Sequence, residues 1–149
     1  HGNAAGNPSF AAVAYTDIAS GDIASAAQYL AGTASKLVQS GVIYQAQTTT
    51  TFGSTTTFDF STFIDTQVTL TGNITTMTLT NVVVGKAGSI AFTQDGTGSR
   101  TAAFNTIFKF PGGVIPTLST TAGAIDILYY HCRTTLYCPA SLTKDVRNP

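Results

Sequence analysis

His131 and Asp126 are the two residues in the body of this chain that come nearest to a catalytic pair. His131 is one of two histidines, and the other, His1, lies at the chain end. An imidazole is the side chain that titrates closest to neutral pH. A Ser/His/Asp arrangement could be assembled from His131, Asp126 and one of the many serines, but no nucleophile-elbow motif accompanies it. Because His131 shares the parity of Ile127 and Tyr129 on a predicted strand, we expect a structural or interface role for it.

Carboxylate pairs are the second kind of chemistry that the residue types allow. All seven acidic residues are Asp, and the chain contains neither Glu nor Trp, both of which are frequent in clefts that cleave sugars. Glycoside hydrolysis needs two carboxylates on either side of one bond. The candidate pairs are Asp59 with Asp65 and Asp95 with Asp126. Asp59 points away from the face of the phenylalanines beside it, and Asp95 lies in a predicted turn. We therefore predict that Asp59 and Asp95 are solvated, and we expect no enzymatic activity.

Cys132 and Cys138 bracket a short segment that we predict to be a hairpin. If Thr135 lies at its centre, the two cysteines face each other on one side of the sheet, at a separation suited to a disulfide. A zinc ion needs four ligands, and only His131 lies near the two cysteines in sequence. We therefore predict no metal site and no cofactor, while the spacing alone leaves the disulfide open.

Two short motifs have simple structural interpretations. Asn73-Ile74-Thr75 fits the acceptor pattern for N-glycosylation, but three-residue matches are frequent in a Thr-rich chain. The Gly-rich run from Asp95 to Ser99 does not open a helix, so it is not expected to cradle a phosphate. We interpret it as a hairpin turn, after which the chain returns as a strand from Arg100.

The composition predicts a β protein with little surface charge. The chain has 149 residues, enough for one compact domain with an appendage, and 27 of them are Thr, whose branched side chain suits a strand. The formal net charge is zero and only 9% of residues are charged, which favours permanent assembly because near-neutral surfaces associate readily. No basic patch is visible, so no nucleic-acid partner is expected. The seven cations are scattered over Lys36, Lys86, Arg100, Lys109, Arg133, Lys144 and Arg147.

No stretch approaches the roughly 20 apolar residues of a membrane span, so membrane insertion is not expected. The start of the chain lacks the basic and apolar regions of a signal peptide. A chain that begins at His1 instead of Met fits a fragment, a cleaved product or the ordered end of a longer polypeptide.

Two regions differ in composition. In residues 1–43 Ala, Gly, Ser and Asn dominate, and large apolar residues are too sparse for independent folding, although 22–30 could form a short helix capped by Asp22. We expect a linker or an extended stalk there and a β-domain over 44–149. Strands are predicted from period-2 alternation, over 55–60, 67–71, 73–82, 88–94, from 100 onward, 126–132 and 136–142. Pro139 favours an edge position for the last strand. The spacing of these short strands predicts an antiparallel β-sandwich or jelly-roll-like fold.

An ordered set of motifs resembles the carboxy-terminal β-domain of bacteriophage tail and head fibre proteins. The most specific motif is Gln94-Asp95-Gly96-Thr97-Gly98-Ser99-Arg100-Thr101, which is followed by Lys109-Phe110-Pro111-Gly112-Gly113 and Pro116-Thr117-Leu118-Ser119-Thr120-Thr121. Weaker matching segments are 27–38, 68–75 and 124–130. The similarity covers residues 27–146, with the Cys132 to Cys138 hairpin and the charged tail 144–147 as departures.

The resemblance implies a structural virion fibre or spike protein. Such a protein is a homotrimer that projects from the phage particle, contacts other virion proteins and attaches to a host-surface glycan or protein. It also implies assembly in the host cytoplasm, where reducing conditions favour free thiols at Cys132 and Cys138. The stalk interpretation of residues 1–43 follows from the same likeness.

Two alternatives stay open beside the fibre. One is a lectin-like carbohydrate-binding adhesin domain, and the other is a capsid decoration protein without receptor binding. A fibre enzyme that degrades polysaccharide is disfavoured by the absence of Glu and Trp. Tyr129, Tyr130 and Tyr137 suit the core, an interface or a binding surface, so the sequence assigns no ligand-contacting residue.

Overall fold

The protein is mainly β in the computed structural model, which describes residues 47–147. The predicted stalk over 1–43 and its helix over 22–30 lie outside the described residues. The only helical element within them is a short 3-10 turn. The elements in chain order are β1 (Thr48–Thr49), β2 (Thr55–Asp59), β3 (Asp65–Leu70), β4 (Thr76–Thr80), β5 (Ala87–Gln94), β6 (Phe108–Lys109), η3 (Pro111–Gly113), β7 (Ile125–His131) and β8 (Cys138–Thr143).

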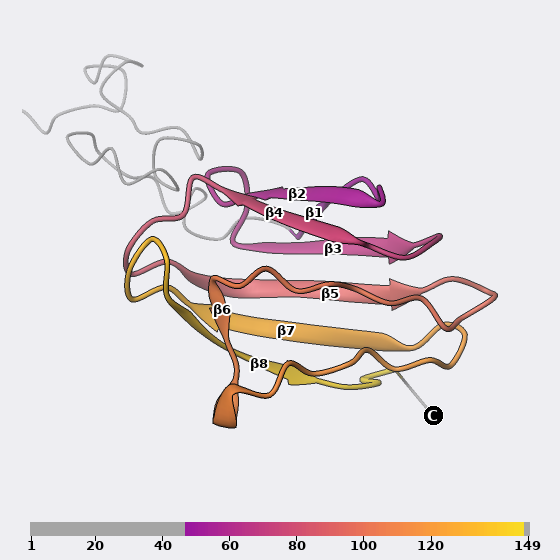
Figure 1. Cartoon of the computed structure of the whole chain (residues 1–149). Coiled ribbons are helices and arrows are strands. Elements are labelled where there is room, and N and C mark those ends of the chain that lie inside the picture. The colour runs from indigo at the N-terminus through magenta and orange to yellow at the C-terminus, as the bar shows by residue number, and fades with distance from the viewer. Residues whose placement is uncertain (1–46, 148–149) are drawn as a thin grey trace, which may run out of the picture.

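The strands form one large mixed sheet and one small parallel ladder (Figure 1). The six-stranded sheet has the order β1-β3-β5-β7-β8-β6, and β2 pairs with β4 in the second ladder. β1, β3 and β5 run parallel to one another, whereas β7 is antiparallel to both β5 and β8. The expectation of an antiparallel fold is therefore wrong for β1 to β5 and correct for the β5-β7-β8 part.

The parallel pairing is explained by the way the chain alternates between the two ladders. β2 lies between β1 and β3 in sequence, and β4 lies between β3 and β5, so both crossovers that link the parallel strands β1, β3 and β5 contain a strand of the small ladder. Parallel neighbours need a long crossover, for which a helix is the usual solution. Here a facing strand replaces the helix, which is why the absence of helical patterns does not exclude parallel pairing.

Two of the predicted strands differ from the structure: one begins later than expected, and the other is not formed. Ile74, whose parity disagrees with that of Met77 and Leu79, lies before β4 and forms an isolated parallel bridge with Ala102. Ile74 is only 1% exposed, so its apolar side chain is buried although it lies outside the alternation of β4. The strand predicted to return from Arg100 as the partner of β5 is not formed, because the two neighbours of β5 are β3 and β7.

The last strand, β8, is not an edge strand. It lies between β7 and β6, and its Pro139 is in register with Lys109 of β6. Proline has no ladder donor, and β6 is only two residues long, so few backbone bonds are lost at this position. The edge position predicted from Pro139 is therefore replaced by a place next to a very short strand.

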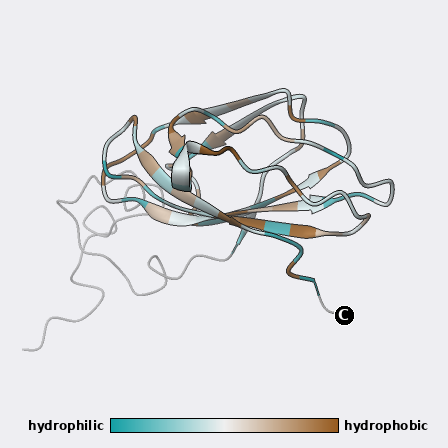
Figure 2. Cartoon of the chain, turned by 60° about the horizontal axis from the view of Figure 1, so that its bottom comes forward, coloured by the Kyte–Doolittle hydropathy of each residue, from teal (hydrophilic) through white to brown (hydrophobic). Residues whose placement is uncertain are grey.

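The core lies between the two ladders and is dominated by aromatic side chains. Figure 2 shows polar and apolar residues interleaved along the strands, as expected when one face of each strand is buried. Phe58 of β2 packs edge-on against Phe92 of β5, with ring centroids 6.2 Å apart. Phe92 in turn packs against Phe104, at 5.7 Å, which holds the irregular segment after the β5 loop onto the large sheet. Each buried ring of this kind contributes about 2–3 kcal/mol of hydrophobic stabilisation.

Candidate functional site

Gln94, the last residue of β5, fixes two loops with one buried side chain. It is 4% exposed, and its Nε2 donates to Arg100 O and to Ser119 O, each at 2.8 Å. Its Oε1 accepts from Arg100 N, also at 2.8 Å. The amide thus bonds the backbone around Arg100 as a neighbouring strand would, and this explains why no paired strand is needed there.

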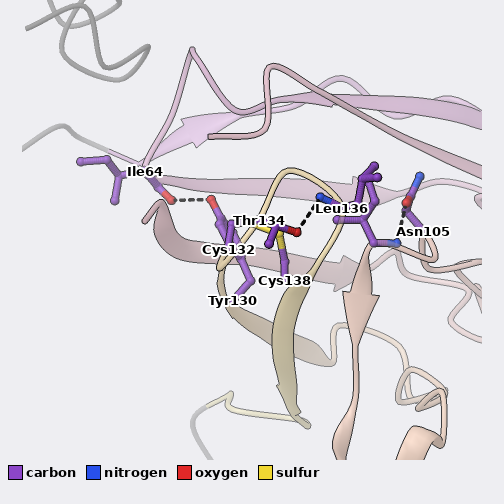
Figure 3. Close-up of a disulfide and its surroundings, with 8 residues drawn as sticks. Ile64, Asn105, Tyr130, Cys132, Thr134, Leu136 and Cys138 are labelled. Carbon is purple, nitrogen blue, oxygen red and sulfur yellow. Dashed lines mark hydrogen bonds between the residues drawn. A yellow bond between two sulfur atoms is a disulfide. The ribbon is translucent and has the colours of Figure 1, made fainter. Parts of the chain in front are cut away.

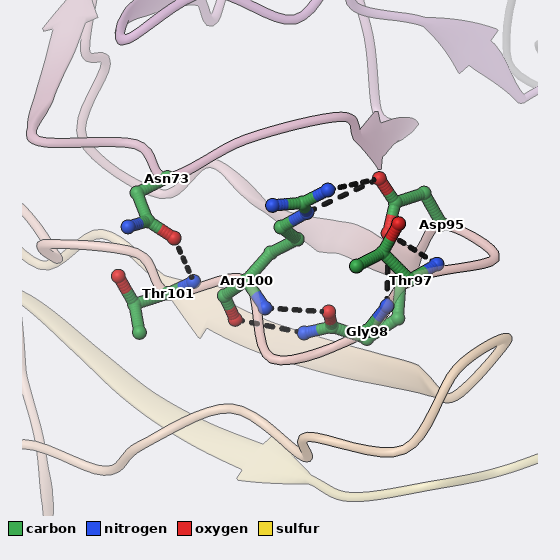
Figure 4. A network of polar contacts seen from close by, with 7 residues as sticks. Asn73, Asp95, Thr97, Gly98, Arg100 and Thr101 are labelled. Atoms are coloured by element: carbon green, nitrogen blue, oxygen red, sulfur yellow. Dashed lines mark hydrogen bonds and ion pairs between the residues drawn. The ribbon is translucent and has the colours of Figure 1, made fainter.

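Asp95 holds the tight turn that follows (Figure 4). Its Oδ1 accepts from Thr97 N at 3.0 Å and from Gly98 N at 2.9 Å. Its Oδ2 accepts from the Arg100 guanidinium, with Nη2 at 2.8 Å. The Arg100 hydrogen bond, aided by the two backbone amides, lowers the pKa of Asp95. The carboxylate is therefore a fixed structural anion and is poorly suited to proton transfer.

Asp126, in the segment 124–130, bonds to the motif segment 116–121. It is 2% exposed, and its Oδ2 accepts from Ser119 N at 2.6 Å while its Oδ1 accepts from Asp145 N at 2.8 Å. Ser99 N donates to Thr120 O at 2.8 Å in the same region. The segments 94–101, 116–121 and 124–126 thus meet in one polar network at one end of the large sheet.

The structure does not bring the catalytic candidates together. Asp126 is buried on the core side of β7, whereas His131 is exposed and lies on the opposite face of that strand. No Ser/His/Asp triad can form from them in this arrangement. Among residues 47–147, no three His, Cys, Asp or Glu side chains are grouped closely enough to hold a metal ion.

The other proposed carboxylate pair is also engaged in local bonds. Asp59 accepts from Ser61 N at 2.9 Å, from Ser61 Oγ at 2.7 Å and from Asn81 Nδ2 at 2.8 Å. Burial alone would raise the pKa of Asp59, but the bonds from Asn81 and Ser61 outweigh it and lower the pKa. Asp65 instead accepts from Ser89 Oγ, at 2.8 Å. The two acids therefore serve separate polar clusters.

Among residues 47–147, Lys86 is a basic residue whose side-chain pKa is strongly shifted. Burial lowers the pKa of its ammonium to about 8, although the nearby carboxylate of Asp59 opposes this shift. Its Nζ donates to Phe60 O and lies 5.8 Å from the ring centroid of Phe63. A shifted pKa can mark a reactive lysine, but here the ammonium satisfies a backbone carbonyl just beyond β2. A structural role explains the geometry.

Cys132 and Cys138 form a disulfide, so the expectation of free thiols is wrong (Figure 3). Both residues are 0% exposed, and their Cα atoms are 3.9 Å apart. Arg133 N and Thr134 N both donate to Tyr137 O, so two residues of one arm oppose one of the other, as in a β-bulge. The hairpin turns between Thr135 and Leu136 instead of at Thr135 itself. A reducing compartment favours free thiols, whereas the bulged hairpin brings the two sulfur atoms together.

A shallow groove lies on the outer face of β7 and β8, away from the core. It has a volume of about 360 Å³ and opens to solvent, and its lining residues are Tyr129, Tyr130, His131, Pro139, Ala140 and Ser141. The alternation predicted for β7 is confirmed here. Tyr130 is buried at 4% exposure, whereas Tyr129 is 48% exposed. Tyr129 stands directly opposite Ser141 in the β7-β8 ladder.

The groove combines aromatic and polar groups. It presents an exposed aromatic ring, an imidazole and a hydroxyl, and no carboxylate lines it. The sequence indicated that Tyr129 and His131 share a face, but it did not point to Pro139 or Ser141. The pairing of Tyr129 with Ser141 depends on the β7-β8 register, which only the hairpin geometry sets.

Comparison with known proteins gives no family for this chain. No protein-family model matches it, and neither the curated proteins nor the solved structures include a significant match. Within residues 47–147, no helix is long and apolar enough to cross a membrane.

Proposed function

We propose that this chain is a non-enzymatic structural module of a bacteriophage fibre or spike, which projects from the virion and attaches it to the host surface. The observation that carries the proposal is the polar network around Gln94, Asp95 and Asp126. Three of the segments that resemble phage fibre domains, 94–101, 116–121 and 124–130, meet in it. A sequence likeness confined to unrelated surface positions would have no such common structural purpose.

The same proposal includes a sandwich-like arrangement and a homotrimer. Two facing ladders that enclose one aromatic core support the sandwich. Exposed apolar side chains on a chain with only 9% charged residues support subunit association. The large apolar side chains that are exposed are Val84, Val114, Ile115, Tyr129, Leu136, Tyr137 and Val146.

The disulfide favours one alternative, a lectin-like adhesin that acts outside the cell. Disulfides persist in secreted proteins and at virion and cell surfaces, and they are rare in the cytosol. The Cys132–Cys138 bond therefore suits a secreted adhesin directly. In a virion it would form only after the particle leaves the reducing cytoplasm.

The solution mass of the complete chain tests the fibre proposal against this alternative. Light scattering on residues 1–149 should give three times the 15.4 kDa of one chain, at concentrations where an adhesin domain would be monomeric or dimeric. A stable monomer or dimer would contradict the trimeric fibre and leave the lectin-like adhesin as the better interpretation.

A further inference from the structure

The groove on β7 and β8 has polar groups that are free to bind a ligand. Within residues 47–147, the side chains of Tyr129, His131 and Ser141 make no hydrogen bond to another protein group. In contrast, every side-chain nitrogen and oxygen of the buried residues Gln94 and Asp126 is hydrogen-bonded to the protein backbone. The outer face of the sheet thus carries unused donors and acceptors beside an exposed ring.

The geometry of the ladder gathers these groups around one space. Tyr129 is opposite Ser141 on β8 and opposite Ser89 on β5. Facing side chains of an antiparallel pair have Cβ atoms roughly 5 Å apart. His131 lies two residues along β7 from Tyr129 and so projects from the same face, roughly 7 Å further along the strand. The apolar face of one ligand ring can therefore lie on Tyr129 while its substituents reach His131 and Ser141.

The charge of the lining narrows the class of ligand. None of the six lining residues is Asp, Glu, Lys or Arg. Asp65, which is in register with Ser89 on the neighbouring strand, accepts a hydrogen bond from Ser89 Oγ at 2.8 Å. Carboxylates and phosphates are normally bound by Arg or Lys, so this groove suits a neutral ligand with an apolar face and several hydroxyl groups.

The disulfide holds the end of the groove in one shape. Cys132 directly follows His131, and Cys138 directly precedes Pro139, so the covalent bond joins the strand ends that carry two lining residues. Both cysteines are 0% exposed and packed in the core. A site that is rigid before binding loses less conformational entropy when a ligand arrives.

From these observations we propose that the β7-β8 groove binds a neutral pyranose ring of a host-surface saccharide. Tyr129 supplies the stacking face, and His131 and Ser141 supply hydrogen bonds to hydroxyl groups. The inference rests on the proposed attachment function and names the ligand class and the residues of that contact. Pro139 completes the apolar wall of the groove.

The test is an NMR titration of the ¹⁵N-labelled complete chain with named trisaccharides. The neutral probes are mannotriose, galactotriose and N-acetylchitotriose, and the anionic probes are sialyllactose and trigalacturonic acid. We expect at least one neutral probe to bind with shifts centred on Tyr129, His131 and Ser141, and to bind more tightly than either anionic probe. Absence of binding by all three neutral probes, or a preference for the anionic ones, would overturn the inference.

Substitutions at Tyr129 test whether the saccharide stacks on its aromatic ring. Tyr129→Ala should weaken the binding of that saccharide by about tenfold or more, whereas Tyr129→Phe should keep most of it, because the stacking face is retained. Tyr137→Ala is the matched control, since Tyr137 is 46% exposed but does not line the groove, and it should leave the affinity unchanged. Equal affinities for the wild type and Tyr129→Ala would contradict the groove as the site.

Two further readouts separate this inference from the proposed function. Adhesion of the wild-type chain to a panel of bacterial strains tests attachment itself, and its absence from every strain would count against the proposed function. Adhesion that survives Tyr129→Ala in full would contradict the groove and leave attachment standing. A change from trimer to monomer in Tyr129→Ala would show that the groove is a subunit interface, and this outcome also overturns the saccharide site.

Discussion

Gly98 is the residue with the least room for a side chain in the loop after β5. Its φ is +73°, and a Cβ built there would lie 2.5 Å from Thr120 O and 2.9 Å from Ala122 N. Gly96, two residues earlier, has open space around the same position and no positive φ. The loop therefore contains both a demanding glycine and a matched control.

We expect Gly98→Ala to lower the free energy of unfolding by about 1–3 kcal/mol, because the left-handed backbone and the backbone clash act together. Gly96→Ala should stay within about 0.5 kcal/mol of the wild type. Urea unfolding followed by far-UV circular dichroism measures both. Equal midpoints for the two variants would contradict the fixed loop around Gln94 and Asp95.

Because the pKa of Lys86 is lowered in the folded chain, we expect the free energy of unfolding to rise at alkaline pH. Burial lowers the pKa of Lys86 to about 8 in the folded chain, whereas an unfolded lysine titrates near 10.4. Between about pH 8 and pH 10 the unfolded state therefore binds more protons than the native state, and this group makes stability rise with pH. Below about pH 8 both states bind the proton, so the contribution of Lys86 stops changing.

The variant Lys86→Met should lack this rise. The difference in unfolding free energy between the wild type and Lys86→Met should grow in favour of the wild type from about pH 8 to pH 10. Burial also raises the pKa of Tyr130, which lowers stability above about pH 10 in both proteins. Parallel pH profiles for the two proteins would show that the Lys86 ammonium is solvated in the folded state.

At the scale of elements, the β7-β8 hairpin is the unit that the disulfide stabilises. The bond closes a loop with a sequence separation of 6. Loop-closure entropy for so short a loop corresponds to about 2 kcal/mol of stability. We expect reduction of the wild type to lower the unfolding free energy by about this amount. The double variant Cys132→Ala/Cys138→Ala should not respond to reductant, and a response there would indicate an effect unrelated to this bond.

The sequence predicts most strands because burial on one face repeats every two residues. Phe58, Val68, Ile90 and Leu128 each lie on the buried face that the alternation indicates, and Tyr129 lies on the exposed one. Alternation contains no information on which strand is the neighbour or in which direction it runs. Parallel pairing of β3 with β5 and antiparallel pairing of β5 with β7 give the same pattern within β5.

The parts that could not be predicted depend on contacts between distant segments. Gln94 reaches Ser119, and Ile74 pairs with Ala102, and neither contact leaves a local periodic pattern. The loop after β5 was predicted as a hairpin because its glycines fit a turn, yet a side-chain amide replaces the second strand. For the groove, parity indicates that Tyr129 faces outward, but its neighbour Ser141 follows from a register set by the bulged hairpin.

At the scale of the whole molecule, one run of aromatic rings connects all the layers. Phe60 stacks on Tyr130 of β7 with ring centroids 4.8 Å apart, and Phe108 lies 6.0 Å from the same ring. Phe92 bridges β2 and the irregular segment through Phe58 and Phe104. Because neither the β2-β4 ladder nor the segment around 104–110 has a core of its own, we expect the described domain to unfold as one unit.

Phe92→Ala tests this cooperativity most directly. Phe92 is 1% exposed and touches rings from both covering segments, so its removal should lower the unfolding free energy by about 3–5 kcal/mol. Tyr137→Ala, which removes an exposed ring, should change it by less than about 0.5 kcal/mol.

Far-UV circular dichroism and tyrosine fluorescence should give coincident urea transitions in the wild type and in both variants. Because the chain has no Trp, the fluorescence comes from Tyr residues such as the buried Tyr130, which reports on the core directly. Separated transitions, or a loss of only a few tenths of a kcal/mol in Phe92→Ala, would mean that the two ladders are stabilised independently and that the aromatic run does not join them.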